Sequence, residues 1–197
     1  MLLILIPGRY NSYCFNAALF ISSLTFILSL IMWLIFDSGH NSFQFLCTID
    51  WLPAFNFYYT VGVDGISLFF LILTTFLIMV CVLISWGSIN YRLKEYLINF
   101  LLLEFLLIQV FSVLDLLLFY VFFESILMPM FLIIGIWGSR ERKIRAAYQF
   151  FLYTLVGSVL MLLGILIIYS HGGTTDLQML WNLEFSEKKQ IFLWVSF

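Results

Sequence analysis

Charged residues are scarce in this sequence. They make up 10% of its 197 residues, whereas hydrophobic residues make up 63%; an average soluble domain has about 25% charged residues. A small soluble domain has a large surface for its volume, and so little charge does not cover it. The composition therefore excludes a soluble enzyme, a disordered tail and a nucleic-acid-binding protein, and makes the lipid bilayer the solvent for most of the chain.

Cysteine and histidine are rare as well. The three cysteines, Cys14, Cys47 and Cys81, are far apart and odd in number, which argues against a disulfide framework, an iron–sulfur cluster and a CxxC zinc site. The two histidines, His40 and His171, lie outside the apolar runs, so a haem held by histidines on spanning helices is not expected. No glycine-rich phosphate loop follows a strand. We therefore expect this chain to bind no metal ion and no cofactor.

A helix that spans a bilayer needs about 20 mostly apolar residues, and the apolar stretches of this sequence predict five spanning helices. They are Phe15–Ile35, Ile66–Trp86, Leu97–Phe111, Leu116–Trp137 and Ala146–Ser170. The third and fourth runs form one apolar stretch, and we place a tight hairpin at its least apolar point, Ser112–Asp115. A polar, aromatic loop is expected between the first two runs. The predicted fold is a single membrane domain over residues 1–197, an all-α, polytopic transmembrane helix bundle.

The basic residues are distributed unevenly over the connecting segments. Alternate segments face the same side of the membrane, and one side receives Arg9, Arg92, Lys94, Arg140, Arg142, Lys143 and Arg145. The other side receives only Lys188 and Lys189. Because cytoplasmic segments carry the excess of Lys and Arg, the first side is predicted to face the cytoplasm, or the matrix if the membrane is mitochondrial.

Two glutamates lie inside the apolar runs. Glu104 and Glu124 are each ten residues from Leu114 at the centre of the predicted hairpin, which places both carboxyls about 15 Å from the turn and near the middle of the bilayer. A carboxylate there costs several kcal/mol unless it is protonated, paired or hydrated, so the pair suggests proton handling. A neutral glutamate in one interhelical hydrogen bond is the alternative, and sequence spacing leaves open whether the two carboxyls face each other.

Three other features in or beside the apolar runs have structural explanations: a proline, an aspartate and one face of the fifth run. Pro129 follows Glu124 and frees the carbonyl of Ser125; a water-lined site and a simple kink explain it equally well. Asp64 opens the second run, and a helix N-cap explains it better than catalysis does. A polar and small face on the fifth run favours close helix packing, with a hydrated path as the alternative; it consists of Gln149, Tyr153 and Gly157.

Several segments resemble chain 4 of NADH:ubiquinone oxidoreductase, respiratory complex I. They are Gly62–Leu68 (GVDGISL), Phe119–Met130 (FYVFFESILMPM), Trp137–Gly138 and Tyr148–Ser158 (YQFFLYTLVGS). Two more resemble the plant and protist mitochondrial forms: Gly173–Asp176 (GTTD) and Phe185–Gln190 (FSEKKQ). The Phe-Glu-x-x-Leu-x-Pro stretch is specific to the antiporter-like subunits, and the resemblance runs from about Met1 to Phe197.

The resemblance implies a proton-pumping subunit of the membrane arm, in the mitochondrial inner membrane or, alternatively, a bacterial plasma membrane. In that family the glutamate that matches Glu124 is a functional proton site. Glu104 has no firm family motif, so its role as a possible proton relay depends on its depth alone. NADH, FMN, the iron–sulfur clusters and ubiquinone are implied to bind other subunits, and other membrane-arm subunits and the lipid bilayer are the implied partners.

The sequence departs from that family in length. Met1–Ile6 and Ile191–Phe197 resemble parts of spans, and the family's Lys partner for Glu124 would lie on a helix that begins near Gln190. We therefore expect the N-terminal part of a chain 4 subunit, contributing half of a proton path, with either a complementary C-terminal fragment or a truncated sequence. The alternatives are an Mrp-type cation/proton antiporter subunit and a purely structural membrane fragment.

Overall fold

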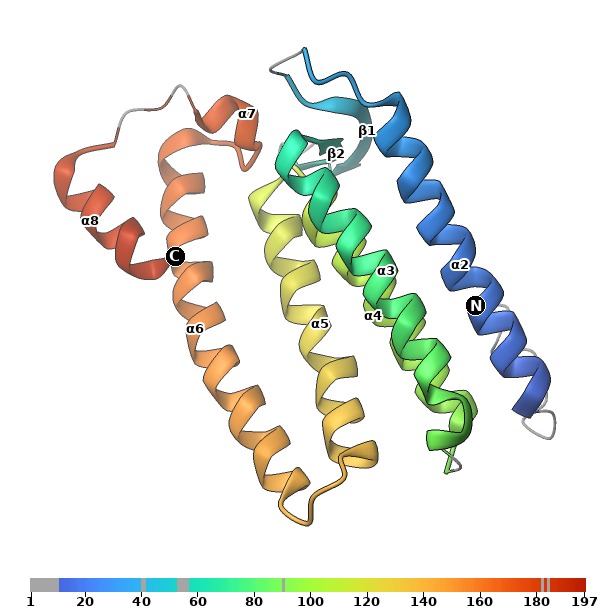
Figure 1. Ribbon diagram of the computed structural model, residues 1–197. Helices are drawn as coiled ribbons and strands as arrows, with labels where there is room; N and C mark the ends of the chain where they lie inside the picture. Colours follow the sequence, from blue (N-terminus) through green and yellow to red (C-terminus); the bar gives the residue numbers. More distant parts are fainter. Residues whose placement is uncertain (1–10, 40–41, 53–56, 90, 182, 184) are drawn as a thin grey trace.

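Five long helices dominate the computed structural model, which describes residues 11–39, 42–52, 57–89, 91–181, 183 and 185–197 (Figure 1). They are α2 (Asn11–Ile35), α3 (Gly65–Ser88), α4 (Leu93–Ser112), α5 (Leu116–Trp137) and α6 (Lys143–Gly172). All five are long and apolar enough to cross a membrane, which confirms the five predicted spans and the helix-bundle fold class. The predicted tight hairpin is also confirmed, since only three residues separate α4 from α5.

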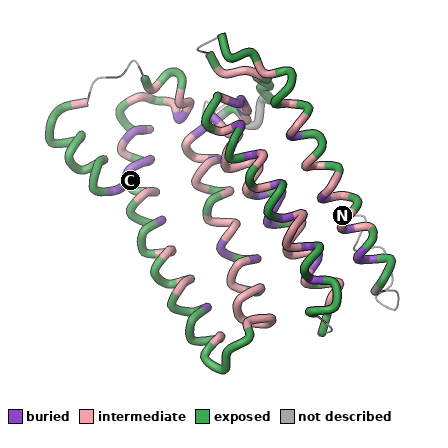
Figure 2. The backbone as a smooth tube through the Cα atoms, in the orientation of Figure 1, coloured by how far each residue is buried: buried purple, intermediate pink, exposed green. Residues whose placement is uncertain are grey.

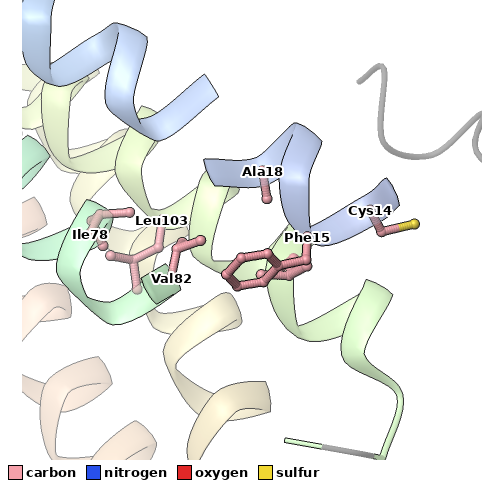
Figure 3. Packing of buried hydrophobic residues seen from close by; sticks show 7 residues of the cluster. Cys14, Phe15, Ala18, Ile78, Val82 and Leu103 are labelled. Atoms are coloured by element: carbon pink, nitrogen blue, oxygen red, sulfur yellow. The ribbon is translucent and has the colours of Figure 1, made fainter. Parts of the chain in front are cut away.

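The long helices form two connected groups. α2, α3 and α4 all contact one another, α5 packs on α4, and α6 packs on α5. A buried cluster joins the first group where α2 begins: Cys14, Phe15 and Ala18 of α2 belong to it together with Ile78 and Val82 of α3, and the Phe15 ring is directed toward Val82 (Figure 3). Many large apolar side chains of the long helices are exposed, and Figure 2 shows exposed residues along the length of the bundle. Such exposed apolar side chains suit contact with lipid.

The polar, aromatic loop expected between the first two spans contains two strands. β1 (Gln44–Leu52) and β2 (Phe57–Val63) form an antiparallel hairpin, with Thr48 opposite Thr60 and Ile49 opposite Tyr59. The second strand is composed of aromatic and β-branched residues almost throughout, which are the residues that fit a pleated sheet. The hairpin lies at the end of the bundle where α2 finishes and α3 begins (Figure 1).

The bundle has two chemically different ends. The α3–α4 and α5–α6 links lie at one end, where Trp137 Nε1 donates a hydrogen bond to the Tyr91 carbonyl at 2.8 Å. Arg92 and Arg142 therefore lie at the same end, which is called the basic end below. The hairpin, the α4–α5 link and the C-terminus of α6, with His171, lie at the opposite, hairpin end (Figure 1). Arg92 and Arg142 thus lie at the end opposite His171, as the distribution of basic residues predicts. Met1–Ile6, Arg9 and His40 lie outside the described residues.

Two short helices follow α6. α7 (Leu177–Leu180) lies at the hairpin end, and α8 (Glu187–Ser196) packs beside α6. The helix expected to begin near Gln190 thus begins at Glu187. Asp64 caps α3 as predicted: its side chain accepts from Ser67 N, and Ser67 Oγ accepts from Asp64 N.

Candidate functional site

Glu104 lies on α4 and is buried, with its carboxyl bonded to α2. Its side chain is 3% exposed, and its Oε1 lies 2.5 Å from Thr25 Oγ1 on α2, which donates to it. The same Thr25 hydroxyl also lies 2.9 Å from the Ser22 carbonyl one turn back along α2. Glu104 is therefore held by a hydroxyl that has a second acceptor available.

A cavity of about 330 Å³ begins beside this pair and extends to the hairpin. Its walls come from α2, α3, α4 and both strands of the hairpin, and Thr25 is one of the lining residues. Polar groups line it at several levels: the hydroxyls of Ser29 and Thr75 are 3.0 Å apart, and Tyr59 donates to the side-chain oxygen of Gln109. Burial raises the pKa of the Tyr59 phenol and outweighs the lowering by Gln109, so Tyr59 is neutral at physiological pH.

Glu124 lies in α5, eight residues after the helix begins. Its side chain is half-buried, and its Oε2 is buried without a hydrogen-bond partner among the described residues. An unpaired carboxyl oxygen shielded from water is costly. α5 runs without a break through Pro129, whose ring is fully buried. Glu124 is therefore a polar group that still requires a proton or a partner.

The structure does not join the two glutamates. Glu104 is directed to α2 by its bond with Thr25, and no hydrogen bond between the carboxyls of Glu104 and Glu124 is found in the described part of the chain. Their equal distance from the α4–α5 link, which the sequence predicts, thus does not bring them into one site. Each carboxyl has its own surroundings, and the two are treated separately below.

A cavity of about 360 Å³ lies between α5, α6 and α8. Phe123, the neighbour of Glu124 in sequence, lines it together with Thr154, Gly157 and Val195. The polar face predicted on the fifth run is exposed at Gln149, Tyr153 and Gly157, so this face does not pack closely against the rest of the described chain. The open face and the unpaired Glu124 oxygen belong to neighbouring helices, α6 and α5.

Sequence reasoning missed the role of Asp115, which it placed only in a turn. Asp115 is 2% exposed, and its Oδ1 caps α5 by accepting from the backbone nitrogens of Leu117 and Leu118. Its Oδ2 accepts from Thr175 Oγ1 at 2.5 Å. Through Thr175, the GTTD segment that follows α6 is therefore hydrogen-bonded to the α4–α5 link. The signal was present in the sequence, but no spacing rule pairs positions so far apart.

Backbone hydrogen bonds connect the α4–α5 link both to the hairpin and to the segment after α6. Leu114 N donates to the Thr60 carbonyl at 2.9 Å, Leu116 N donates to the Thr175 carbonyl at 3.0 Å, and Leu177 N donates to the Leu114 carbonyl at 2.9 Å. Three segments distant in sequence are thus joined at the hairpin end, next to the hairpin residues that line the cavity beside Thr25. The residues described include no group of three or more His, Cys, Asp or Glu that could hold a metal ion.

Comparisons with known proteins agree with this architecture. Residues 113–197 match the family model "NADH:quinone oxidoreductase/Mrp antiporter, TM". The chain is 66% identical over 196 residues to NADH-ubiquinone oxidoreductase chain 4 of Chondrus crispus and 56% identical over 197 residues to that of Arabidopsis thaliana. Each alignment covers 100% of this chain and 40% of the relative, so the chain spans about two fifths of the length of these relatives.

Solved structures show the same fold. A chain of respiratory complex I from Thermus thermophilus with bound NADH superposes with a TM-score of 0.82 at 28% identity, covering 99% of this chain and 39% of that one. A chain of the Mrp complex from Dietzia sp. superposes with a TM-score of 0.81 at 14% identity, covering 95% of this chain and 20% of that one, a likeness of fold alone. Along its whole length the chain is similar in sequence to NADH-ubiquinone oxidoreductase chain 4, and its fold is an antiporter-like transmembrane helix bundle.

Proposed function

We propose that this chain is part of a membrane-arm subunit of respiratory complex I and contributes one half of a proton-translocation path, in which Glu124 carries the proton. The observation that carries the proposal is the buried Oε2 of Glu124, which has no hydrogen-bond partner within the described residues. A structural glutamate in a membrane helix is expected to satisfy both oxygens. A glutamate that loads and unloads a proton requires an incoming donor instead.

The surroundings of Glu124 support a partner from outside the described bundle. The cavity beside Phe123 and the exposed face of α6 leave space next to α5. In this proposal, helices equivalent to the remaining length of the relatives cover that space and bring a membrane-embedded Lys to Glu124. A separate complementary fragment and a longer form of the same subunit would both supply such helices.

The proposal also includes the membrane that the chain crosses and the subunits that bind the cofactors. The basic end faces the matrix of a mitochondrial inner membrane, in keeping with the positive-inside rule; a bacterial plasma membrane is the alternative. The subunit works in an NADH:ubiquinone reductase that translocates protons, together with other membrane-arm subunits and lipid. Those other subunits hold NADH, FMN, the iron–sulfur clusters and ubiquinone, and this chain completes no active site alone.

Glu124→Gln is the test of the proton role. The amide keeps the size and hydrogen-bonding capacity of the side chain but cannot titrate, so the complex should assemble while proton pumping and coupled quinone reduction fall sharply. Glu104→Gln is the comparison and should have a milder effect. Proton uptake by vesicles that hold the assembled variant complex is the measurement, and normal pumping by Glu124→Gln would leave Glu124 with a structural role only.

An Mrp-type cation/proton antiporter subunit is the second candidate, because the family model that matches residues 113–197 includes Mrp antiporters. The two candidates differ in what they assemble with. Recovery of this chain in a purified complex that reduces quinone with NADH supports the first candidate. Recovery in a complex that exchanges cations for protons without quinone reduction supports the second. A purely structural fragment would tolerate Glu124→Gln in either complex.

A further inference from the structure

We propose that the cavity between α2, α3, α4 and the hairpin is filled with water, and that Glu104 exchanges its proton through it with the hairpin end of the bundle by way of the Thr25 hydroxyl. The proposal rests on the proposed function only in placing the chain across a proton-moving membrane. It assigns Glu104 to a route separate from the one proposed for Glu124.

The size and lining of the cavity favour water over an empty space. A volume of about 330 Å³ has room for about ten water molecules at roughly 30 Å³ each. Cavities that remain dry are lined by apolar groups alone, whereas polar side chains from three helices and one strand stand among the apolar residues that line most of this partly open cavity. The polar side chains are Thr25, Ser29, Tyr59, Thr75, Gln109 and Ser112.

The polar groups also lie at successive depths. Ser29 follows Thr25 by four residues, so both lie on the same face of α2, and the Ser29 hydroxyl meets that of Thr75 across the gap to α3. Gln109 and Tyr59 meet nearer the hairpin. Each hydroxyl oxygen has two acceptor lone pairs besides its one proton, so bound water finds partners from the hairpin down to Thr25.

The bonds of Thr25 allow Glu104 to exist in two protonation states. When Glu104 is ionised, the Thr25 proton points to its Oε1 at 2.5 Å. When Glu104 is protonated, its own O–H donates to Thr25 Oγ1, and the Thr25 proton turns to the Ser22 carbonyl at 2.9 Å. The hydrogen bond between Glu104 Oε1 and Thr25 Oγ1 is kept in both states, which differ in the proton on Glu104 and in the direction of the Thr25 hydroxyl. A site that satisfies both states suits a group that takes up and releases a proton.

The exchange is balanced at each step. A hydronium ion in the cavity gives a proton to Thr25 Oγ1, and the Thr25 O–H gives its own proton to the ionised Oε1 of Glu104. The threonine is regenerated, the carboxyl becomes neutral, and one water molecule remains in the cavity. The reverse sequence releases the proton. No cationic side chain lines the cavity, and the basic residues at the start of α4, Arg92 and Lys94, lie ten or more residues away, about 15 Å or more along a helix.

An apolar occupant is the alternative. The cavity also has apolar walls, including Leu28, Met32 and Ile108, so a lipid acyl chain would fit beside them. Water and an acyl chain give opposite results with a charged, membrane-impermeant thiol reagent, because the reactive thiolate forms in water and not in hydrocarbon. Cysteine substitution at measured depths therefore separates the two.

The experiment uses the assembled complex in sealed vesicles of known orientation, with Cys47→Ser and Cys81→Ala as background. Ser29→Cys and Thr25→Cys place thiols in the cavity, and Ile27→Cys, 51% exposed on the apolar side of the same helix, is the matched control. Assembly on native gels shows that each variant is folded. We expect Ser29→Cys and Thr25→Cys to react from the hairpin side at least about tenfold faster than Ile27→Cys.

Each other result overturns a stated part of the proposal. Equal, slow reaction of all three variants means that the cavity holds no water. Reaction of Ser29→Cys without that of Thr25→Cys means that water stops short of Glu104, which removes the relay. Faster reaction from the basic end than from the hairpin end reverses the direction of access. None of these readouts depends on pumping, so failure here is distinct from a failed Glu124→Gln test.

Discussion

Thr175 Oγ1 donates a 2.5 Å hydrogen bond to Asp115 Oδ2 across 60 positions of sequence. Both residues are buried, at 0% and 2% exposure. The other carboxylate oxygen of Asp115 caps α5, so one side chain holds the start of that helix and the segment after α6 at the same time. Because the neighbouring backbone also binds the hairpin, this contact organises the whole hairpin end.

Asp115→Ala should lower stability markedly. It removes an N-cap, which costs about 1 kcal/mol, and leaves the Thr175 hydroxyl buried without its acceptor, which costs about 1–3 kcal/mol more. The measurement is the temperature at which the assembled complex loses this chain on native gels. Thr175→Ser keeps the donor and should behave as wild type, whereas Thr175→Val should lose part of the stability. If the Asp115→Ala complex were as heat-resistant as wild type, Asp115 would not stabilise the hairpin end.

Gly62→Ala should disturb the packing where the hairpin lines the cavity between α2, α3 and α4. A Cβ at Gly62 would lie 2.8 Å from Leu114 Cδ1 and 2.9 Å from Leu46 Cδ2, and such overpacking typically costs about 1–3 kcal/mol. Gly65→Ala is the matched control three residues later, because its Cβ would meet nothing within 4 Å. Heat resistance of the assembled complex should fall for the first variant only. Equal loss in both would indicate that a general backbone effect, and not contact with Leu114, is responsible.

Arg92 and Arg142 should share one side of the membrane, opposite His171. The bond between Trp137 and Tyr91 joins the two basic links, and α6 carries the chain to the other end. In sealed vesicles, cysteines introduced at Arg92 and Arg142 should react with an impermeant thiol reagent from the same side of the membrane. A cysteine introduced at His171 should react from the opposite side. Reaction of Arg92→Cys and His171→Cys from the same side would contradict this topology.

The elements that could be predicted are those set by local composition. An uninterrupted run of about 20 apolar residues has few stable conformations other than a membrane-spanning helix, so α2 to α6 could be predicted. The N-cap role of Asp64 could be predicted because Asp is favoured at helix starts. The hairpin was missed because neither strand alternates regularly between polar and apolar residues: β1 mixes them without a period, and β2 is aromatic and β-branched almost throughout.

The partners of the buried acids could not be predicted. Glu104 meets Thr25 across 79 positions, and the depth of Glu104 in the bilayer says nothing about the rotation of α4 about its axis. The same depth argument suggested that Glu104 and Glu124 could meet, whereas helix rotation directs Glu104 to α2. Asp115 resembled an ordinary turn residue for a similar reason, since its function depends on Thr175 after the end of a later helix.

The exposed face of α6 provides the last prediction, because the proposed function requires protein there. Tyr153 is 85% exposed, and a Cβ at Gly157 would meet nothing within 4 Å, although both lie on α6, which packs against α5, the helix that carries Glu124. Residues with so much polar and small surface in a bilayer are expected to contact other helices. A photoreactive group attached to Tyr153→Cys should therefore cross-link to a protein segment that carries a membrane-embedded Lys. Phe69→Cys on α3, 62% exposed and without a neighbouring unpaired carboxyl, is the comparison. Mass spectrometry of the cross-linked peptides identifies the partner, and cross-links from Tyr153→Cys to lipid alone would mean that nothing delivers a Lys to Glu124 from this side.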